Sequence, residues 1–192
     1  MTGRVMRVSP KPTLHLTVGL PGVGKTTLAR ELEQASGALR LTPDEWMVPL
    51  FGLRWTDFGG KRDVLEGRLI WVAHQVLRAG VSVILDFGCW SPDERYALRA
   101  IAAVAGADFE LHYLVLPEDE RKKRATARWR ESPEEVFEMS PEDHEAFFAQ
   151  FSPPTVEEVE GRSLPAPPTP FETWFAWASD RWPSLPRLDR AY

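Results

Sequence analysis

The segment GLPGVGKTTLAR (Gly19–Arg30) constrains the fold more than any other part of the chain. It follows the apolar run LHLTV, which predicts a buried strand, and it leads into a helical pattern. A glycine-rich loop between a strand and a helix turns successive backbone N–H groups toward a phosphate. The positions that fit the Walker A pattern G-x-x-x-x-G-K-[ST] are Gly19, Gly24, Lys25 and Thr26.

Each residue type in this loop has a mechanical role in holding a nucleotide. Lys25 adds positive charge at the β- and γ-phosphates, and the hydroxyl of Thr26 can ligate Mg²⁺. The helix that starts at the loop adds the positive end of its dipole to the same site. The sequence therefore predicts a site for ATP with Mg²⁺. The residues expected to hold the nucleotide are Gly19, Leu20, Pro21, Gly22, Val23, Gly24, Lys25, Thr26 and Thr27.

Further apolar runs alternate with helical patterns along the chain. The predicted strands are 14–18, a weak 38–41, 81–85 and 109–116, and the predicted helices are 27–34, 61–79, 92–105 and 118–130. Strands that alternate with helices in this way form a parallel sheet covered by helices. The predicted fold class is therefore α/β, a three-layer sandwich around a parallel central sheet.

Composition excludes several functional classes. A net charge of −5 argues against non-specific nucleic-acid binding across the whole surface. The single cysteine, Cys89, excludes an internal disulfide and any multi-cysteine metal site, and it suits a reducing cytoplasm. The four histidines show no metal-ligand spacing in the sequence, and we expect them to be structural or surface residues. With no secretory signal and no apolar run of spanning length, we expect a soluble cytoplasmic protein with no membrane partner.

The chain is expected to form one main domain, 1–160, followed by a different C-terminal segment, 161–192. Within the main domain, residues of about 118–145 are expected to form a lid. The C-terminal segment begins with the proline-rich connector SLPAPPTP and continues with FETWFAWASDRW. Three tryptophans so close together predict that this part packs back on the domain, and a partner or substrate surface is the alternative.

An acidic residue follows the third predicted strand. In VSVILDFG the strand ends at Asp86, and the parallel sheet would bring this carboxylate beside the phosphate loop, where it can help to hold the metal. The alternative is an ordinary aspartate that caps a turn. The letters Asp86-Phe87-Gly88 also match a protein-kinase motif, but no catalytic loop of that family accompanies them, so we treat the match as coincidence.

Two further segments offer groups for phosphoryl transfer. In LTPDEW, Asp44 follows the weak second strand and is a candidate general base; its alternative role is to complement a helix dipole. In PEDERKKRATARWRE, Arg121, Arg124 and Arg128 are spaced so that they share one helix face. Arg124 and Arg128 are our candidates for neutralising the transferred phosphate, and the alternative is a solvated helix face.

Taken in order, GLPGVGKTT, LTPDEW, VILDFGCWSPDER and HYLVLPEDERKKRATAR resemble the small P-loop kinases of the zeta-toxin, chloramphenicol phosphotransferase and polynucleotide 5′-kinase group. The resemblance covers roughly residues 14–158. It implies a nucleoside-kinase-like fold with a helical lid, and it implies that Asp44 is the general base. It also implies that the Asp86–Arg95 segment binds the acceptor and that Arg124 and Arg128 belong to the lid. VFEMSPED (136–143) and FSPPTVEE (151–158) resemble two further stretches of the family.

The chain departs from the polynucleotide kinases of this group at one informative place. Those kinases usually have Thr or Ser and then Asn after the aspartate of the third strand, where this chain has Phe87-Gly88. The acidic run around 131–145 would also repel a polyanion. The aromatic residues that could line a pocket for a nucleoside, sugar-nucleotide or drug-like ring, or that could instead belong to the core, are Trp46, Phe51, Trp55, Phe58 and Trp90.

The sequence thus predicts a kinase that moves the γ-phosphate of ATP to a hydroxyl of a small molecule. The first alternative is a polynucleotide 5′-hydroxyl kinase, and the second is a nucleotide-dependent switch or partner-binding protein without an acceptor. The predicted catalytic residues are Lys25, Asp44, Arg124 and Arg128, and the predicted metal ligands are Thr26 and Asp86. The candidate acceptor-binding residues are Asp44, Trp46, Arg54, Trp55, Asp86, Trp90, Arg95 and Glu138.

Overall fold

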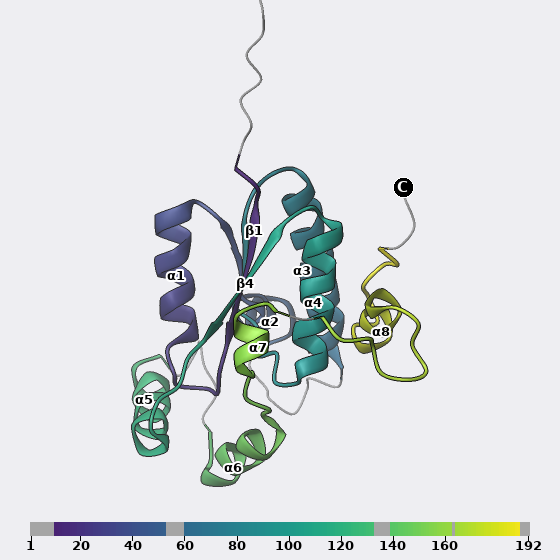
Figure 1. Ribbon diagram of the computed structural model, residues 1–192. Helices are drawn as coiled ribbons and strands as arrows, with labels where there is room; N and C mark the ends of the chain where they lie inside the picture. Colours follow the sequence, from purple (N-terminus) through teal and green to yellow (C-terminus); the bar gives the residue numbers. More distant parts are fainter. Residues whose placement is uncertain (1–9, 53–59, 133–138, 163, 189–192) are drawn as a thin grey trace, which may run out of the picture.

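Four parallel strands form the centre of the molecule (Figure 1). The computed structural model describes residues 10–52, 60–132, 139–162 and 164–188. The strands are β1 (Thr13–Val18), β2 (Leu39–Leu41), β3 (Val83–Leu85) and β4 (Asp108–Tyr113), in the spatial order β2-β3-β1-β4. The parallel sheet predicted from the alternating pattern is confirmed. The third strand starts two residues later than predicted, and the fourth ends at Tyr113 rather than continuing to 116.

Helices cover both faces of this sheet, which makes a three-layer α/β sandwich (Figure 1). The first four are α1 (Lys25–Ser36), α2 (Pro43–Phe51), α3 (Lys61–Arg78) and α4 (Pro92–Val104). They are followed by α5 (Glu118–Glu131), α6 (Pro141–Gln150), α7 (Val156–Val159) and α8 (Trp174–Arg181). Helix α1 lies on one face of the sheet and helices α3 and α4 on the other, while α5 and α6 lie beyond the edge where the strands end (Figure 1).

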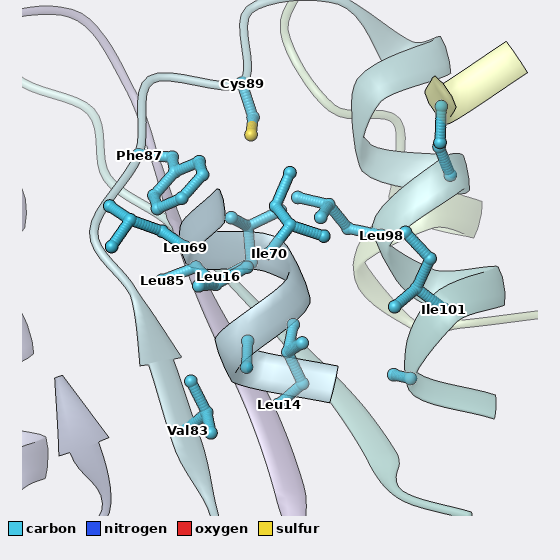
Figure 2. Packing of buried hydrophobic residues seen from close by; sticks show 14 of the residues in the cluster. Leu14, Leu16, Leu69, Ile70, Val83, Leu85, Phe87, Cys89, Leu98 and Ile101 are labelled. Atoms are coloured by element: carbon cyan, nitrogen blue, oxygen red, sulfur yellow. The ribbon is translucent and has the colours of Figure 1, made fainter. Parts of the chain in front are cut away.

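The main core fills the space between the sheet and helices α3 and α4 (Figure 2). Alternate residues of each strand point to this side, as the period of two along a strand requires. A smaller cluster around Ala29 and Ile84 lies on the α1 side. The labelled core residues in Figure 2 are Leu14, Leu16, Leu69, Ile70, Val83, Leu85, Phe87, Cys89, Leu98 and Ile101.

The C-terminal segment contributes to this same core. Trp174, Trp182 and Leu185 are buried together with the residues of α3 and α4. The indole N–H of Trp182 donates a hydrogen bond to Glu66 Oε2 at 3.1 Å, and Arg181 forms ion pairs with Asp63 and Glu94. Burying an indole ring of this size is strongly favourable when its N–H has a partner. Among the described residues, no helix is both long and apolar enough to cross a membrane.

Candidate nucleotide and acceptor site

The phosphate loop leaves the carboxyl end of β1, packs against helix α5 and leads into the start of α1. At Gly22 the backbone has φ 89°, and a Cβ atom there would lie 2.5 Å from the carbonyl oxygen of Arg121. At Gly19 a Cβ atom would lie 2.6 Å from the carbonyl oxygen of Leu114. Only glycine permits both the positive φ and these approaches. Gly19 and Gly22 therefore let the loop pack directly against the backbone of Leu114 and Arg121.

Helix α1 begins without a side-chain cap. Its N-cap is Gly24, with no side-chain hydrogen bond, and its first turn contains no acidic residue. Helices α4, α6 and α7, by contrast, each begin with a complete capping box. A helix start without a cap presents free N–H groups and the positive end of the dipole to an anion. This is the arrangement that a bound polyphosphate needs.

Lys25 is the charged group at the centre of the site. Its Nζ donates hydrogen bonds to the carbonyl oxygens of Gly19 and Leu20, at 2.9 and 3.2 Å. Burial lowers the pKa of Lys25 to about 8, against the opposing attraction of Asp86 and Asp44. The cationic groups that also act on this lysine are Arg62 and Arg128. Residues from four separate segments therefore concentrate their charges around one ammonium group.

Asp86 follows β3 directly and is buried. Its Oδ1 accepts a hydrogen bond from Thr17 Oγ1 at 2.9 Å, and its Oδ2 accepts one from Thr42 Oγ1 at 3.3 Å. Sequence reasoning did not find these two threonines, because only the strand order β2-β3-β1 brings the ends of β1 and β2 to either side of β3. The two hydroxyl groups hold the carboxylate in one orientation.

The donor set fits the metal that the fold implies. The hydroxyl of Thr26 and the carboxylate of Asp86 are hard oxygen ligands, which Mg²⁺ prefers. Each carboxylate oxygen has a second lone-pair direction beyond the one used by a threonine. Mg²⁺ also keeps several waters and takes few protein ligands, so two oxygens at the phosphate loop suffice.

Asp44 lies in the first turn of α2 and pairs with an arginine from another helix. Its Oδ1 accepts a hydrogen bond from Arg62 Nη1 at 2.6 Å, and its side chain is 53% exposed. The protein around Asp44 desolvates this accessible carboxylate only in part, which raises its pKa, but the charges of Arg62, Lys25 and Arg128 outweigh that effect, and the pKa lies below its ordinary value. Asp44 is therefore an ionised, accessible carboxylate. Arg62 was missed, since nothing in the sequence links it to Asp44.

The three arginines of α5 have different surroundings, although their spacing suggested one shared face. Arg128 acts electrostatically on both Lys25 and Asp44. Arg124 is exposed and pairs with Glu120 one turn earlier. Arg121 is buried, and its Nη1 donates to Pro21 O at 3.2 Å and to His144 Nδ1 at 3.0 Å. Arg121 thus ties the phosphate loop to α5 and α6, a role that the sequence did not reveal.

The structure places Arg95 in a buried ion pair. Its Nε lies 2.8 Å from Glu158 Oε1, and its Nη1 donates to the carbonyl oxygens of Cys89 and Ser152. Its Nη2 donates to the other oxygen of Glu158. Arg95 therefore fixes the loop that follows Asp86 against the segment before α7. This contact joins the two parts of the chain in which the resemblance was noted, DFGCWSPDER and FSPPTVEE.

Candidate acceptor-side aromatic residues lie on α2 and in the loop after Asp86. The ring of Trp90 packs on Phe147 of α6 with centroids 4.9 Å apart. Its buried Nε1 has no hydrogen-bond partner among the described residues. Trp46 of α2 is half-exposed, and Phe51 is also exposed. The remaining candidates, Arg54, Trp55, Phe58 and Glu138, lie outside the described residues.

Together, the sheet order, the glycine loop and the uncapped α1 define a P-loop nucleotide-binding domain. The family model described as an AAA domain matches residues 14–154, and the chain belongs to this family. No curated protein shows significant similarity to the chain.

Solved structures share this fold. A candidate kinase from Chloroflexus aurantiacus J-10-fl has a TM-score of 0.61 and 22% identity, covering 76% of this chain and 82% of that one. A chain of the Pnkp1/Rnl/Hen1 RNA repair complex has a TM-score of 0.60 and 21% identity, covering 79% of this chain but only 46% of that one.

A third structure is the APS kinase CysC of Mycobacterium tuberculosis in complex with AMPPNP and APS. It has a TM-score of 0.50 and 24% identity, covering 64% of this chain and 73% of that one. The small P-loop kinase resemblance is thereby confirmed at the level of family and fold.

Proposed function

We propose that this protein is an ATP-dependent phosphotransferase that moves the γ-phosphate of ATP to a hydroxyl group of a small molecule. The observation that carries the proposal is the convergence of Asp86, Asp44 and Arg128 on the Lys25 ammonium group, whose charge each of them influences. A nucleotide site alone needs the loop and a metal ligand. The additional exposed carboxylate beside it is what transfer to a hydroxyl requires.

Each group then has a defined part in the reaction. The loop N–H groups and Lys25 hold the β- and γ-phosphates, and Thr26 and Asp86 hold Mg²⁺, which neutralises phosphate charge when bound. Asp44 accepts a hydrogen bond from the acceptor hydroxyl and orients its oxygen. That oxygen forms a bond to the γ-phosphorus as the bond to the β–γ bridging oxygen breaks, ADP leaves, and Asp44 takes the hydroxyl proton late in transfer.

Two features of the acceptor side favour a small molecule. Exposed and half-buried rings, including Trp46 and the Trp90–Phe147 pair, suit a flat or apolar group better than a phosphate backbone. Helix α6 begins with acidic residues, and the net charge of the chain is −5. Both would oppose a polyanion. The likeness to an APS kinase solved with AMPPNP and APS also supports this reading.

A polynucleotide 5′-hydroxyl kinase is the second candidate. It is favoured by the fold shared with a chain of an RNA repair complex. Transfer to an oligonucleotide would fall steeply with salt, because each phosphate contact releases counterions. A nucleotide-dependent switch is the third candidate, and it would hydrolyse ATP slowly without transferring phosphate to any acceptor.

A transfer assay with γ-labelled ATP tests the proposal. Wild-type protein, Asp44→Asn and Glu45→Gln are offered 5′-hydroxyl oligonucleotides or a pool of nucleosides, sugar-nucleotides and antibiotics. Glu45 is the matched control, since it adjoins Asp44 on α2 but pairs with Arg40. We expect label on one small-molecule fraction with wild type and Glu45→Gln, and none with Asp44→Asn. Label on the oligonucleotide favours the second candidate, and free phosphate alone favours the third.

A further inference from the structure

A cluster of two histidines and a glutamate lies on the sheet at the β1–β4 pair. His15 belongs to β1, and Glu110 and His112 belong to β4, where the register places His15 opposite Glu110. The face of β4 opposite these residues carries Phe109, Leu111 and Tyr113 toward the core side. The period of two therefore puts all three polar side chains on the other face, the face on which α1 lies.

The ligand atoms of these side chains converge. His15 Nδ1 lies 3.1 Å from Glu110 Oε2 and 3.2 Å from His112 Nε2, and His112 Nε2 lies 3.8 Å from the same glutamate oxygen. In a tetrahedral Zn²⁺ site with ligand bonds of about 2.0–2.1 Å, two ligand atoms lie about 3.3 Å apart. The three measured separations are close to that value, so one ion could contact all three atoms after small side-chain adjustments.

We propose that His15, Glu110 and His112 form a binding site for a divalent transition-metal ion of the Zn²⁺ class. Two imidazoles and one carboxylate are a ligand set that Zn²⁺ takes, and imidazole selects such ions over Mg²⁺. The site is separate from the phosphate loop, and its ligand chemistry differs from the hydroxyl and carboxylate pair proposed there for Mg²⁺. It does not depend on the proposed kinase function.

The three ligand side chains differ in how much they are exposed to solvent. The side chains of His15, His112 and Glu110 are 11%, 23% and 57% exposed, so the open side of the cluster faces solvent beside Glu110. A fourth ligand would therefore be water.

An ion at this position would link β1 to β4, and these two strands lead to different parts of the candidate site. Strand β1 leads into the phosphate loop at Gly19, and β4 leads toward the lid helix α5. Because the three ligands come together only in the folded sheet, an ion that binds there stabilises the folded state by mass action. The competing explanation is a hydrogen-bonded cluster without metal, in which one imidazole donates to the other.

Metal titration of the chelator-treated full-length protein separates these explanations. Zn²⁺ binding is measured by calorimetry without nucleotide, and thermal unfolding is followed with and without Zn²⁺. Co²⁺ substitution adds a direct reading of ligand geometry from its visible absorption. We expect wild type to bind one Zn²⁺ with a raised Tm, and His112→Gln and Glu110→Ala to bind it on the order of tenfold or more weakly. Millimolar Mg²⁺ should not compete.

Two variants guard against other interpretations. His74→Gln removes a histidine of α3 outside the cluster and should keep the Zn²⁺ response. Asp86→Asn alters the nucleotide site and should also keep it. Glu110 is mostly exposed, so its replacement tests the site even if substitution of a buried histidine prevents folding. Equal Zn²⁺ binding by wild type, His112→Gln and Glu110→Ala, or no binding at all, would overturn the proposal, as would loss of binding only in Asp86→Asn.

Discussion

Trp182, near the end of the chain, donates its indole N–H to Glu66 on α3 across 3.1 Å. The other oxygen of Glu66 accepts a hydrogen bond from Arg62 at 2.9 Å, and Arg62 in turn bonds Asp44 at 2.6 Å. Glu66 and Arg62 thus connect Trp182 of the C-terminal segment to the candidate base Asp44. Hydrogen bonds therefore connect the tryptophan-rich C-terminal segment to Asp44 on α2, in addition to its packing in the core.

Replacing Trp182 should destabilise the whole domain. Trp182→Ala removes a fully buried ring and is expected to lower the free energy of unfolding by about 3–5 kcal/mol. Trp182→Phe keeps most of the ring but leaves a buried oxygen of Glu66 without its donor, at a cost of about 1–3 kcal/mol. Chemical denaturation measures both. Leu164→Ala, at an exposed position of the same segment, should change stability by less than about 0.5 kcal/mol.

Removing Arg62 should shift the pH dependence of transfer. Arg62 lowers the pKa of Asp44, so in wild type the base stays ionised as the pH falls below the ordinary range of a carboxylate. In Arg62→Gln that pKa rises, and the acid limb of the kcat/KM profile should move to higher pH. Arg78→Gln, at the exposed end of α3, is the control and should leave the limb in place. An acid limb that does not move in Arg62→Gln would argue against Asp44 as the base.

The lowered pKa of Lys25 predicts that ATP binds more weakly in alkaline solution. The free protein holds this pKa at about 8, whereas bound phosphates favour the charged ammonium and raise it. Above pH 8 binding must therefore take up a proton, and affinity falls as pH rises. Between pH 7 and pH 9 the loss should be about tenfold. Calorimetry in buffers of different ionisation enthalpy measures the proton, and Lys25→Met should bind weakly without this pH dependence.

Gly22 should be intolerant of any side chain. In Gly22→Ala the new methyl group would meet the Arg121 carbonyl oxygen at 2.5 Å and would also strain a backbone with φ 89°. We expect ATP affinity to fall by more than about tenfold, since the loop must move away from α5. Gly80→Ala separates the two effects, because its φ is 85° and no atom lies within 4 Å of the added carbon. It should cost about 1–2 kcal/mol of stability and leave ATP affinity unchanged.

Among the lid arginines, Arg128 should matter most for the rate. It already acts on Lys25 and Asp44, whereas Arg124 must first give up its pairing with Glu120. Arg128→Gln is expected to lower kcat by about 10²–10³-fold, the usual cost of losing one preorganised donor at a developing charge. Arg124→Gln should lower it less. Single-turnover kinetics at saturating ATP compare the two, and the opposite order would show that the lid reorganises on binding.

The elements that the sequence predicted are those with strong local signals. The loop between β1 and α1 has a fixed spacing of glycines, and α3 and α4 have clear amphipathic periods or caps. Helices α6 and α7 were not predicted, although each starts with a readable capping box, Ser140 with Asp143 and Thr155 with Glu158. Short polar helices of this kind have little apolar periodicity to reveal them.

The partners within the site depend on topology and could not be predicted locally. Thr17 and Thr42 meet at Asp86 only because β3 lies between β1 and β2. The histidine cluster could not be predicted locally either, because His15 and His112 lie far apart in the sequence and have no metal-ligand spacing. The parallel register of β1 and β4 brings His15 Nδ1 to 3.2 Å from His112 Nε2, although the two residues are 97 positions apart in the sequence.

The uncapped start of α1 has a consequence for how the protein and its nucleotide depend on each other. Every other helix in the described part of the chain begins with a side-chain cap or an acidic first turn, and α1 has neither. Its first-turn N–H groups therefore lack a side-chain acceptor, and the polyphosphate of the proposed nucleotide would supply the acceptors that hydroxyl and carboxylate groups supply at the other helices. The groups that would bind the proposed nucleotide are thus the ones that complete the first turn of α1, so nucleotide binding and the stability of this helix are expected to be coupled.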